Sequence, residues 1–351
     1  MLKCIDHYSI NILNIKRMQF KNFIGIDVSK LTLDVSLVVD GVQTNYQQIK
    51  NEEKSIKKYF SSFLKHAMIE DSIVCMEFTG IYNERIINYL NKINLMCWME
   101  SGLQIKLSQG FTRGKSDKVD ALRIAMYAYT HQHKVKVYKA PRTVIKKLSS
   151  LIALRTRIIK ATGNMSKSLS ELQLFGDKET LKVLHRINTP IIKQLQKQLL
   201  AVDLEIKETI YSDEKLKRLF ILITSVPGVG IQTAVNIITT TNEFISITDA
   251  KKFACYSGVV PFEHSSGTSI RGKHKVSQKA NKSMKCLLHM AAISNMTCKS
   301  SDLKDYYLRK VGEGKNKMSV INAVRNKIVL RIFSCVKNNK PYERYLVKEA
   351  A

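Results

Sequence analysis

Asn22-Phe23-Ile24-Gly25-Ile26-Asp27-Val28 is the stretch that decides the fold of this chain. It is a short apolar run that ends on an acid, which is typical of a buried strand. Leu31 to Val39 then alternates as a half-buried strand does, and a third such run follows Gly41. The sequence therefore predicts three successive strands joined by short turns.

Helices and strands alternate along the next part of the chain. We expect a helix over residues 53–66, a buried strand from Ser72 to Glu77, a helix after Gly80 and a short strand from Leu95 to Trp98. Three meandering strands followed by alternating helices and strands form an α/β order that is compatible with the ribonuclease H fold.

Beyond Pro141 the pattern becomes helical. Thr189-Pro190 predicts a helix start, because a hydroxyl can cap the helix and proline suits its first position. Apolar residues then recur at spacings of four, three, four and four in a coiled-coil-like seam: Leu195, Leu199, Val202, Ile206 and Ile210. We expect residues 144–215 to form a long helical hairpin between two domains.

The charge balance points to a nucleic acid partner. Lys and Arg total 57 against 29 Asp and Glu, a formal net charge of +28. The excess is clustered: residues 121–170 hold eleven Lys or Arg and no acid, and residues 264–301 are also free of acids. A basic surface kept for solubility would not need such clusters, whereas a polyanion would neutralise them.

Other features exclude further classes of protein. The seven cysteines include no C-x-x-C pair, which argues against a zinc ribbon and a disulfide scaffold and favours a reducing cytosol. The apolar run from Leu219 to Val226 is far too short to span a bilayer. We therefore expect a cytoplasmic protein without a membrane partner. Residues 1–17 form a poorly patterned extension, with Met18 as an alternative start.

Four acids are the candidate catalytic residues. Asp27 ends the first strand, Glu77 ends the strand from Ser72, and Asp117 and Asp120 open an apolar helix at a spacing that puts both on one face. In a ribonuclease-H-like sheet these carboxylates would converge, and their repulsion would be relieved by Mg²⁺. The alternative is that each acid is a turn residue, with Asp117 as a helix cap.

A glycine turn precedes the apolar helix expected from Ile231 to Ile238. Val226-Pro227-Gly228-Val229-Gly230 resembles a helix-hairpin-helix turn, in which the amides near Gly228 and Gly230 approach a DNA phosphate. A tight interhelical turn with no ligand is the alternative.

A serine segment follows, and it is the candidate nucleophile. Ser265 and Ser266 lie between small residues and are followed by four cations, which are Arg271, Lys273, Lys275 and Lys279. A serine in such a setting can attack a phosphorus while the cations hold the developing charge. Spacing alone does not distinguish this segment from an ordinary loop, nor Ser265 from Ser266.

Together these blocks resemble the DEDD transposases of bacterial insertion sequences, the insertion sequence 110 family. The N-terminal resemblance lies in residues 24–30, 76–82 and 115–121. The C-terminal resemblance lies in residues 225–230, 253–261 and 266–281, and the match covers about residues 20–335 in order.

The resemblance implies a RuvC-like domain, a coiled-coil linker and a mostly α C-terminal transposase domain. It implies that Asp27, Glu77, Asp117 and Asp120 hold Mg²⁺ and that Ser266, directly before Gly267, becomes joined to cleaved DNA. It further implies a bridge RNA that pairs with donor and target double-stranded DNA, and a tetramer whose active sites combine residues of different subunits.

The expected regions are an N-terminal extension (1–20), a RuvC-like domain (21–140), a coiled-coil region (141–217), a C-terminal transposase domain (218–335) and a tail (336–351). We expect RNA to bind along residues 121–170. Phosphate contacts are expected from Lys115, Lys146, Lys147, Arg155, Arg157, Arg271, Lys273, Lys275 and Lys279, and at Gly228 and Gly230. Two other hypotheses are a nuclease for Holliday junctions that uses only the acids, and a protein that only binds nucleic acid.

Overall fold

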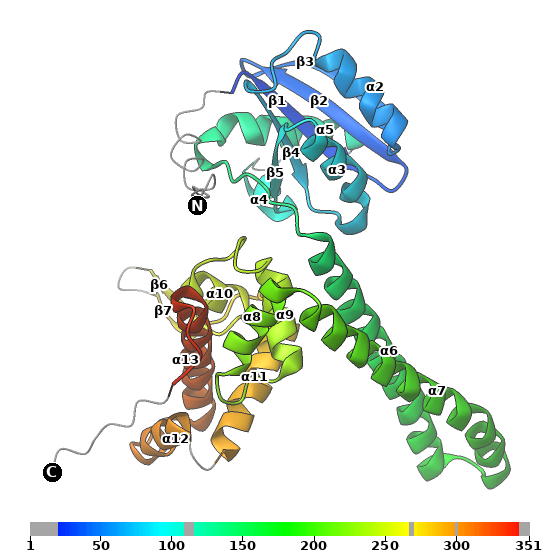
Figure 1. The fold of residues 1–351 in the computed structure, drawn as a ribbon, viewed down its shortest axis with the longest axis vertical. Coiled ribbons are helices and arrows are strands. Elements are labelled where there is room, and N and C mark those ends of the chain that lie inside the picture. The colour runs from blue at the N-terminus through cyan, green and yellow to red at the C-terminus, as the bar shows by residue number, and fades with distance from the viewer. Residues whose placement is uncertain (1–19, 109–115, 267–269, 299–300, 344–351) are drawn as a thin grey trace, which may run out of the picture. The chain divides into compact units, whose positions relative to one another are not determined.

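The computed structural model describes residues 20–108, 116–266, 270–298 and 301–343, without the side chains of residues 263–271 and 273–275. The chain divides into two compact units, one up to Ala140 and one from Pro141 (Figure 1). Lys115 and Met18 lie outside the described residues.

The first unit is built on a five-stranded mixed sheet. Its strands are β1 (Asn22–Val28), β2 (Thr32–Val39), β3 (Val42–Lys50), β4 (Ser72–Glu77) and β5 (Met96–Glu100). Their order in the sheet is β3-β2-β1-β4-β5, with β1–β2 and β2–β3 antiparallel and β1–β4 and β4–β5 parallel. The predicted strands are confirmed, and their order is consistent with a ribonuclease-H-like sheet.

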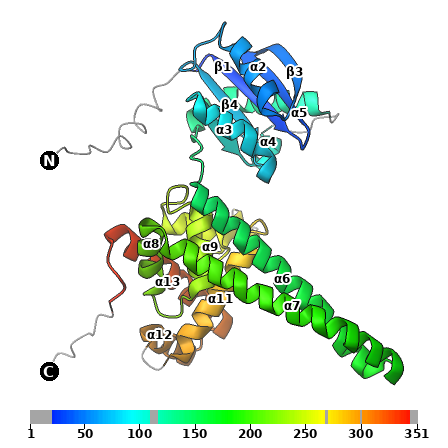
Figure 2. The same ribbon diagram turned by 45° about the vertical axis from the view of Figure 1, so that its right-hand side comes forward.

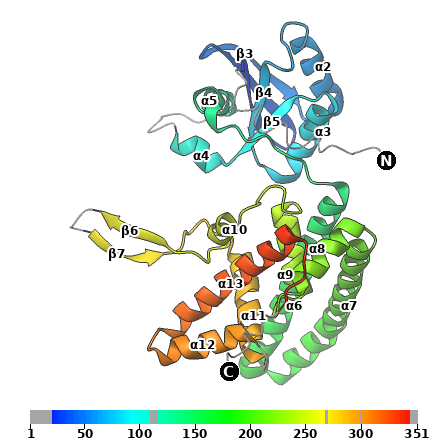
Figure 3. The same cartoon turned by 60° about the vertical axis from the view of Figure 1, so that its left-hand side comes forward.

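Helices cover both faces of this sheet (Figure 3). On one face α2 and α3 bury Ile56, Phe60 and Leu90 against Ile24 and Ile26 of β1. On the other face α5 packs on β1, β2 and β4. The elements are α2 (Glu53–Phe63), η1 (Gly80–Asn83), α3 (Glu84–Lys92), α4 (Gly102–Leu107), α5 (Asp117–Thr130) and η2 (Gln132–Lys134).

Gly25 determines how closely α5 approaches the sheet. A Cβ atom at Gly25 would lie 2.3 Å from the carbonyl oxygen of Ala121 and 2.3 Å from the amide nitrogen of Ala125. Only a glycine on the strand and small residues on the helix permit this contact. Because Asp27 lies two residues along on the same face of β1, the contact also brings the start of α5 toward Asp27.

The second unit begins with a long helical hairpin, as predicted. Helix α6 (Thr143–Phe175) and helix α7 (Lys178–Tyr211) run side by side (Figure 2). The predicted helix start at Thr189-Pro190 is wrong. Helix α7 starts twelve residues earlier, where Asp177 accepts hydrogen bonds from the amides of Glu179 (3.0 Å) and Thr180 (2.8 Å). Pro190 lies inside the helix at an exposed position, where the loss of one backbone hydrogen bond is tolerated.

The lower part of the hairpin shares one hydrophobic core with the C-terminal helices. Val202, Ile206 and Ile210 of the predicted seam are buried there, and Leu195 and Leu199 pack against them. The remaining elements are α8 (Glu214–Thr224), α9 (Ile231–Thr241), α10 (Ala250–Tyr256), α11 (Lys282–Thr297), α12 (Asp302–Gly312) and α13 (Lys317–Asn338). The linker and the C-terminal helices are therefore packed as one body.

Strands β6 (Phe262–Ser266) and β7 (Ile270–Lys275) form an antiparallel hairpin in which Ser266 pairs with Ile270. Figure 3 shows this hairpin extending away from the helices of its unit. Throughout the described parts of the chain, no helix is both long and apolar enough to cross a membrane. The cysteines of these parts are all free thiols: Cys75, Cys97, Cys255, Cys286, Cys298 and Cys335.

The contact at Gly25 is testable by one methyl group. We expect Gly25→Ala to lower the free energy of unfolding by about 1–3 kcal/mol or more, because backbone atoms of α5 must move. Gly163→Ala is the matched control: Gly163 lies within α6 with nothing within 4 Å of an added Cβ, so alanine is expected to stabilise by about 1 kcal/mol. Urea unfolding measures both, and a neutral Gly25→Ala would contradict the contact.

Candidate active site

Acids of four adjacent strands form a row across one face of the sheet. Asp27 of β1 is paired in register with Asp34 of β2, and Glu77 of β4 is paired with Glu100 of β5. Strand β1 also runs parallel to β4, with Ile26 opposite Met76, so the next positions are Asp27 and Glu77. All four acids therefore lie at one level of the sheet, on the face that α5 covers.

Helix α5 contributes the other two predicted acids. Ser116 caps the helix and accepts a hydrogen bond from the amide of Val119 at 3.4 Å, so Asp117 is not the cap. Asp117 and Asp120 both lie in the first turn, where the free amides of the helix favour negative charge. Asp120 is engaged in an ion pair with Arg123 at 2.9 Å.

The electrostatics of Asp27 place these acids in one field. Burial raises the pKa of Asp27 to about 6, and the negative charges of Asp117, Asp120, Asp34 and Glu77 raise it further in that order. A carboxylate shifted in this way is repelled by its neighbours and is stabilised by a cation. Within the described part of the chain, however, no three acidic, histidine or cysteine side chains already form a metal-binding group.

Two acids of the row escaped the sequence analysis, and each is bound by a tyrosine. Asp34 is 1% exposed and accepts a hydrogen bond from the Tyr46 hydroxyl at 2.6 Å, with Gln48 at 3.2 Å. Glu100 accepts one from the Tyr127 hydroxyl at 3.2 Å. The hydrogen bond to Asp34 raises the pKa of Tyr46 to about 12. Both acids had a signal: Asp34 interrupts an apolar strand, and Glu100 ends β5 as Glu77 ends β4.

Glu77 has its own space at the end of β4. A Cβ atom at Gly102 would lie 2.0 Å from one carboxylate oxygen of Glu77, so the absence of a side chain at Gly102 makes room for this carboxylate. Asp27 and Glu77 are thus the two central acids of the row, and Asp34 and Glu100 flank them.

The predicted phosphate contacts of α6 differ in how free they are. Arg155 binds Asp203 of α7 at 2.7 Å, and Lys147 binds Glu205 at 2.6 Å, so both cations tie the two helices of the hairpin together. Arg157 is exposed, whereas Lys146 is half-buried. The exposed cations are the ones that can meet a phosphate without breaking the hairpin's own ion pairs.

The glycine turn between α8 and α9 has a packing role at Gly228. This residue has φ +80°, and a Cβ there would lie 2.4 Å from the carbonyl oxygen of Ala291 in α11. Asn295 of α11 also donates a hydrogen bond to the carbonyl of Pro227 at 2.5 Å. Gly230, which caps α9, has nothing within 4 Å of an added Cβ and is the open position of the turn.

Ser266 is the last residue of β6, next to the hairpin tip. Its side chain, like those of Ser265, Arg271, Lys273 and Lys275, lies outside the described part of the structure, whereas Lys279 is exposed. Ser266 belongs to the second unit and the acids belong to the first.

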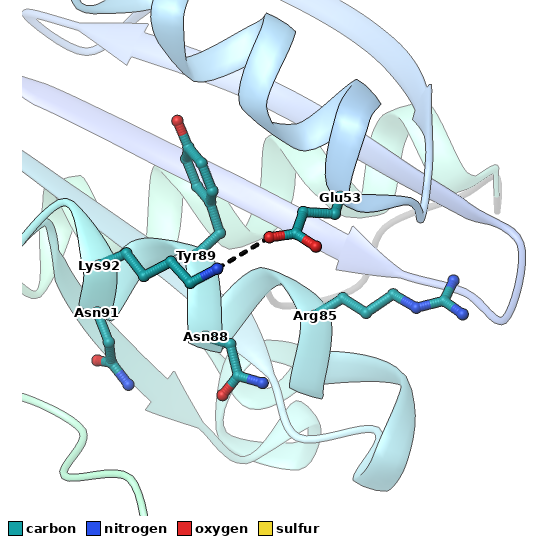
Figure 4. Close-up of a pocket in the computed structure, with 6 residues that line it drawn as sticks. All are labelled: Glu53, Arg85, Asn88, Tyr89, Asn91 and Lys92. Carbon is teal, nitrogen blue, oxygen red and sulfur yellow. Dashed lines mark hydrogen bonds and ion pairs between the residues drawn. The ribbon is translucent and has the colours of Figure 1, made fainter.

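A pocket of about 500 Å³ lies elsewhere, between α2 and α3 (Figure 4). Its cations already have partners: Lys92 binds Glu53 at 2.9 Å, and Arg85 donates to the carbonyl of Asn51 at 2.5 Å. It lies on the face of the sheet opposite α5 and the acids.

Comparison with known proteins adds the family. A model of DEDD transposases of the IS110 type matches residues 24–173, and a model described as transposase IS116/IS110/IS902 family matches residues 221–308. The pilin gene-inverting proteins of Moraxella lacunata and Moraxella bovis are each 22% identical over 332 residues, 92% of this chain and 98% of the relative.

Two further similarities are more limited. An uncharacterized 43.6 kDa protein of insertion element IS110 from Streptomyces coelicolor is 29% identical over 122 residues, 35% of this chain and 30% of the relative. The T. thermophilus RuvC structure in complex with a Holliday junction substrate is 14% identical, with a TM-score of 0.25, over 33% of this chain and 98% of that one.

The two family models match the two units in order, the first over all four DEDD acids and the second over the serine segment. Relatives that align along 92% of the chain are named for inverting a gene. The chain belongs to the IS110 family of DEDD transposases and is a DNA-recombining enzyme.

Proposed function

We propose that this transposase cuts and rejoins double-stranded DNA through a serine-linked intermediate, with Mg²⁺ held by Asp27, Glu77, Asp117 and Asp120. The observation that carries the proposal is the electrostatic environment of Asp27, whose pKa is raised to about 6 by burial and then by acids from three other elements. Several carboxylates that destabilise one another on a sheet edge are the pattern expected of a metal-dependent site.

The donor set suits a hard cation, because all the side chains offered are carboxylates. In the described residues, neither Asp27 nor Glu77 receives a hydrogen bond to its carboxylate, so their oxygens are available as ligands. Asp120 would have to exchange Arg123 for the metal. A bound divalent ion supplies charge stabilisation for the attacking and leaving oxygens of a phosphodiester.

Ser266 is the proposed nucleophile. Its Oγ forms a bond to the phosphorus, the bond from phosphorus to one deoxyribose oxygen breaks, and the serine proton passes through the site to that leaving oxygen. The energy of the phosphodiester is kept in the phosphoserine, so the reverse step can join a new strand. The gene-inverting relatives support cutting followed by rejoining, because inversion needs both.

A bridge RNA and a tetramer complete the proposal. The acid-free stretch of residues 121–170 supports an RNA partner, because exposed cations such as Arg157 and Lys160 follow one another along α6. The acids and Ser266 belong to different units of the chain, which supports a composite site that combines residues of different subunits.

The metal assignment predicts opposite effects of one substitution on stability and on activity. Asp27→Asn removes a carboxylate whose folded-state pKa lies above its unfolded value, so at pH 7 the metal-free protein should melt a few degrees higher. The same variant should lose the Mg²⁺-dependent rise in melting temperature, and strand exchange as well. Asp71→Asn, at the exposed ion pair with Lys21, is the control and should keep both. An unchanged Mg²⁺ response in Asp27→Asn would contradict the assignment.

The serine assignment predicts a covalent adduct. Incubation of the protein with RNA and a nicked suicide DNA substrate should trap a protein–DNA product that survives denaturation and maps to Ser266. Ser266→Ala should abolish the adduct, whereas Ser265→Ala should retain it. If Ser266→Ala still exchanges strands, water or another residue is the nucleophile and the junction-nuclease hypothesis gains support.

The RNA assignment predicts a change in salt dependence. Arg157→Gln with Lys160→Gln should weaken RNA binding and lower the slope of affinity against salt by about two ions. Lys147→Gln is the control, because Lys147 is already paired with Glu205. Filter binding over a range of salt concentrations measures the slopes, and an unaltered slope in the double variant would exclude this face of α6 as the RNA contact.

A further inference from the structure

Arg325 of α13 is a buried cation that the mechanism above does not use. The residue is 5% exposed. One terminal nitrogen donates to Nδ1 of His289 at 2.6 Å, the other donates to Oδ1 of Asn322 at 3.4 Å, and Nε is buried without a partner. Its hydrogen bonds go only to neutral groups.

The other partly buried arginines are treated differently. Arg123 binds Asp120 at 2.9 Å, Arg155 binds Asp203 at 2.7 Å, and Arg331, six residues along α13 from Arg325, binds Asp302 at 3.0 Å. Arg325 is more buried than these and meets no carboxylate. The protein thus supplies counter-charges where it needs them, and it supplies none here.

The helices around Arg325 cannot provide a counter-charge. Helices α10 and α11 both pack on α13, and all three contain no Asp or Glu. Burial lowers the pKa of Arg325, as expected for a cation that has lost water without gaining an anion. A buried guanidinium without a counter-ion is costly, and a bound anion would remove that cost.

The groups beside Arg325 are arranged as donors. An arginine N–H can only donate, so Nδ1 of His289 is an acceptor and the proton of the neutral ring is on Nε2. Burial and the charge of Arg325 lower the pKa of His289, which keeps the ring neutral. His289 is half-buried and Cys286, one turn before it, is exposed, so the guanidinium lies directly beneath the surface of α11.

This pair lies at the root of the hairpin that carries Ser266. Asn322 donates a hydrogen bond to the carbonyl of Val259 at 2.5 Å, and β6 begins three residues later at Phe262. Lys285 of α11 is also near this root, with its Cδ 3.6 Å from a Cβ placed on Gly258. An anion bound by Arg325 would therefore sit where DNA enters the serine hairpin.

We propose that Arg325 and His289 bind one phosphate of the DNA strand at the root of the serine hairpin. The planar guanidinium matches a phosphate with two parallel hydrogen bonds, and Nε2–H of His289 can supply a third. The phosphate would be a neighbour of the one attacked, so the contact would fix the strand relative to the hairpin. The DNA part of this proposal rests on the proposed role of the hairpin; the anion site itself does not.

Inorganic phosphate tests the anion site on the wild-type chain. At constant ionic strength, phosphate in place of chloride should shift the ring signals of His289 in NMR spectra, assigned with His289→Asn. It should also raise the melting temperature more in the wild type than in Arg325→Met, which has no charge to neutralise. Arg331→Met is the matched control: it breaks the pair with Asp302 and lowers stability, but keeps the phosphate response. Unmoved His289 signals, or an equal phosphate response in Arg325→Met, would overturn the site.

DNA binding is then measured in the Ser266→Ala background, where no covalent step contributes. Arg325→Met should weaken duplex binding about 10-fold and reduce the salt slope by about one ion, while Arg325→Lys recovers part of the loss. Unchanged DNA affinity together with a phosphate response would overturn the DNA contact. Because nothing here depends on the adduct, a failed serine assignment leaves the result interpretable.

Discussion

Helix α5 lies on strand β1 at a distance that only a glycine permits. The helix backbone at Ala121 and Ala125 occupies the volume that any Cβ at Gly25 would need. The first turn of α5 is therefore held over the end of β1, and Asp117 and Asp120 come into the field of Asp27. A larger residue at this crossing would lift the helix from the sheet, and the acids would separate. The candidate active site thus depends on a packing contact two residues away.

That packing gathers negative charge in a chain that is strongly basic overall. The sheet contributes Asp27, Asp34, Glu77 and Glu100 at one level, and tyrosines bind the outer two. The central pair is left for a metal. Stability is reduced at this point, since burial and repulsion raise the pKa of Asp27. Such a cost is expected where a site is built for a ligand rather than for the fold.

The second unit has the opposite character. Its core helices α10, α11 and α13 contain no acids, and the cations of the hairpin helices are held by Asp203 and Glu205 where they cross. Arg325 is the buried consequence of this distribution. The glycine turn shows the same preference for packing, because Gly228 lies against the backbone of α11 while Gly230 stays open.

The amino-acid pattern by itself determined the strands, the helical hairpin and the four DEDD acids, because these depend on local periodicity and on the ends of single elements. It misplaced the start of α7, since Thr189-Pro190 has a good local signal but Asp177 caps the helix earlier. Only the tertiary structure revealed Asp34 and Glu100 as members of the acid row, because pairing between strands is not written in either strand alone. The same holds for Arg325: its burial without a carboxylate is set by three helices that meet only in the folded chain.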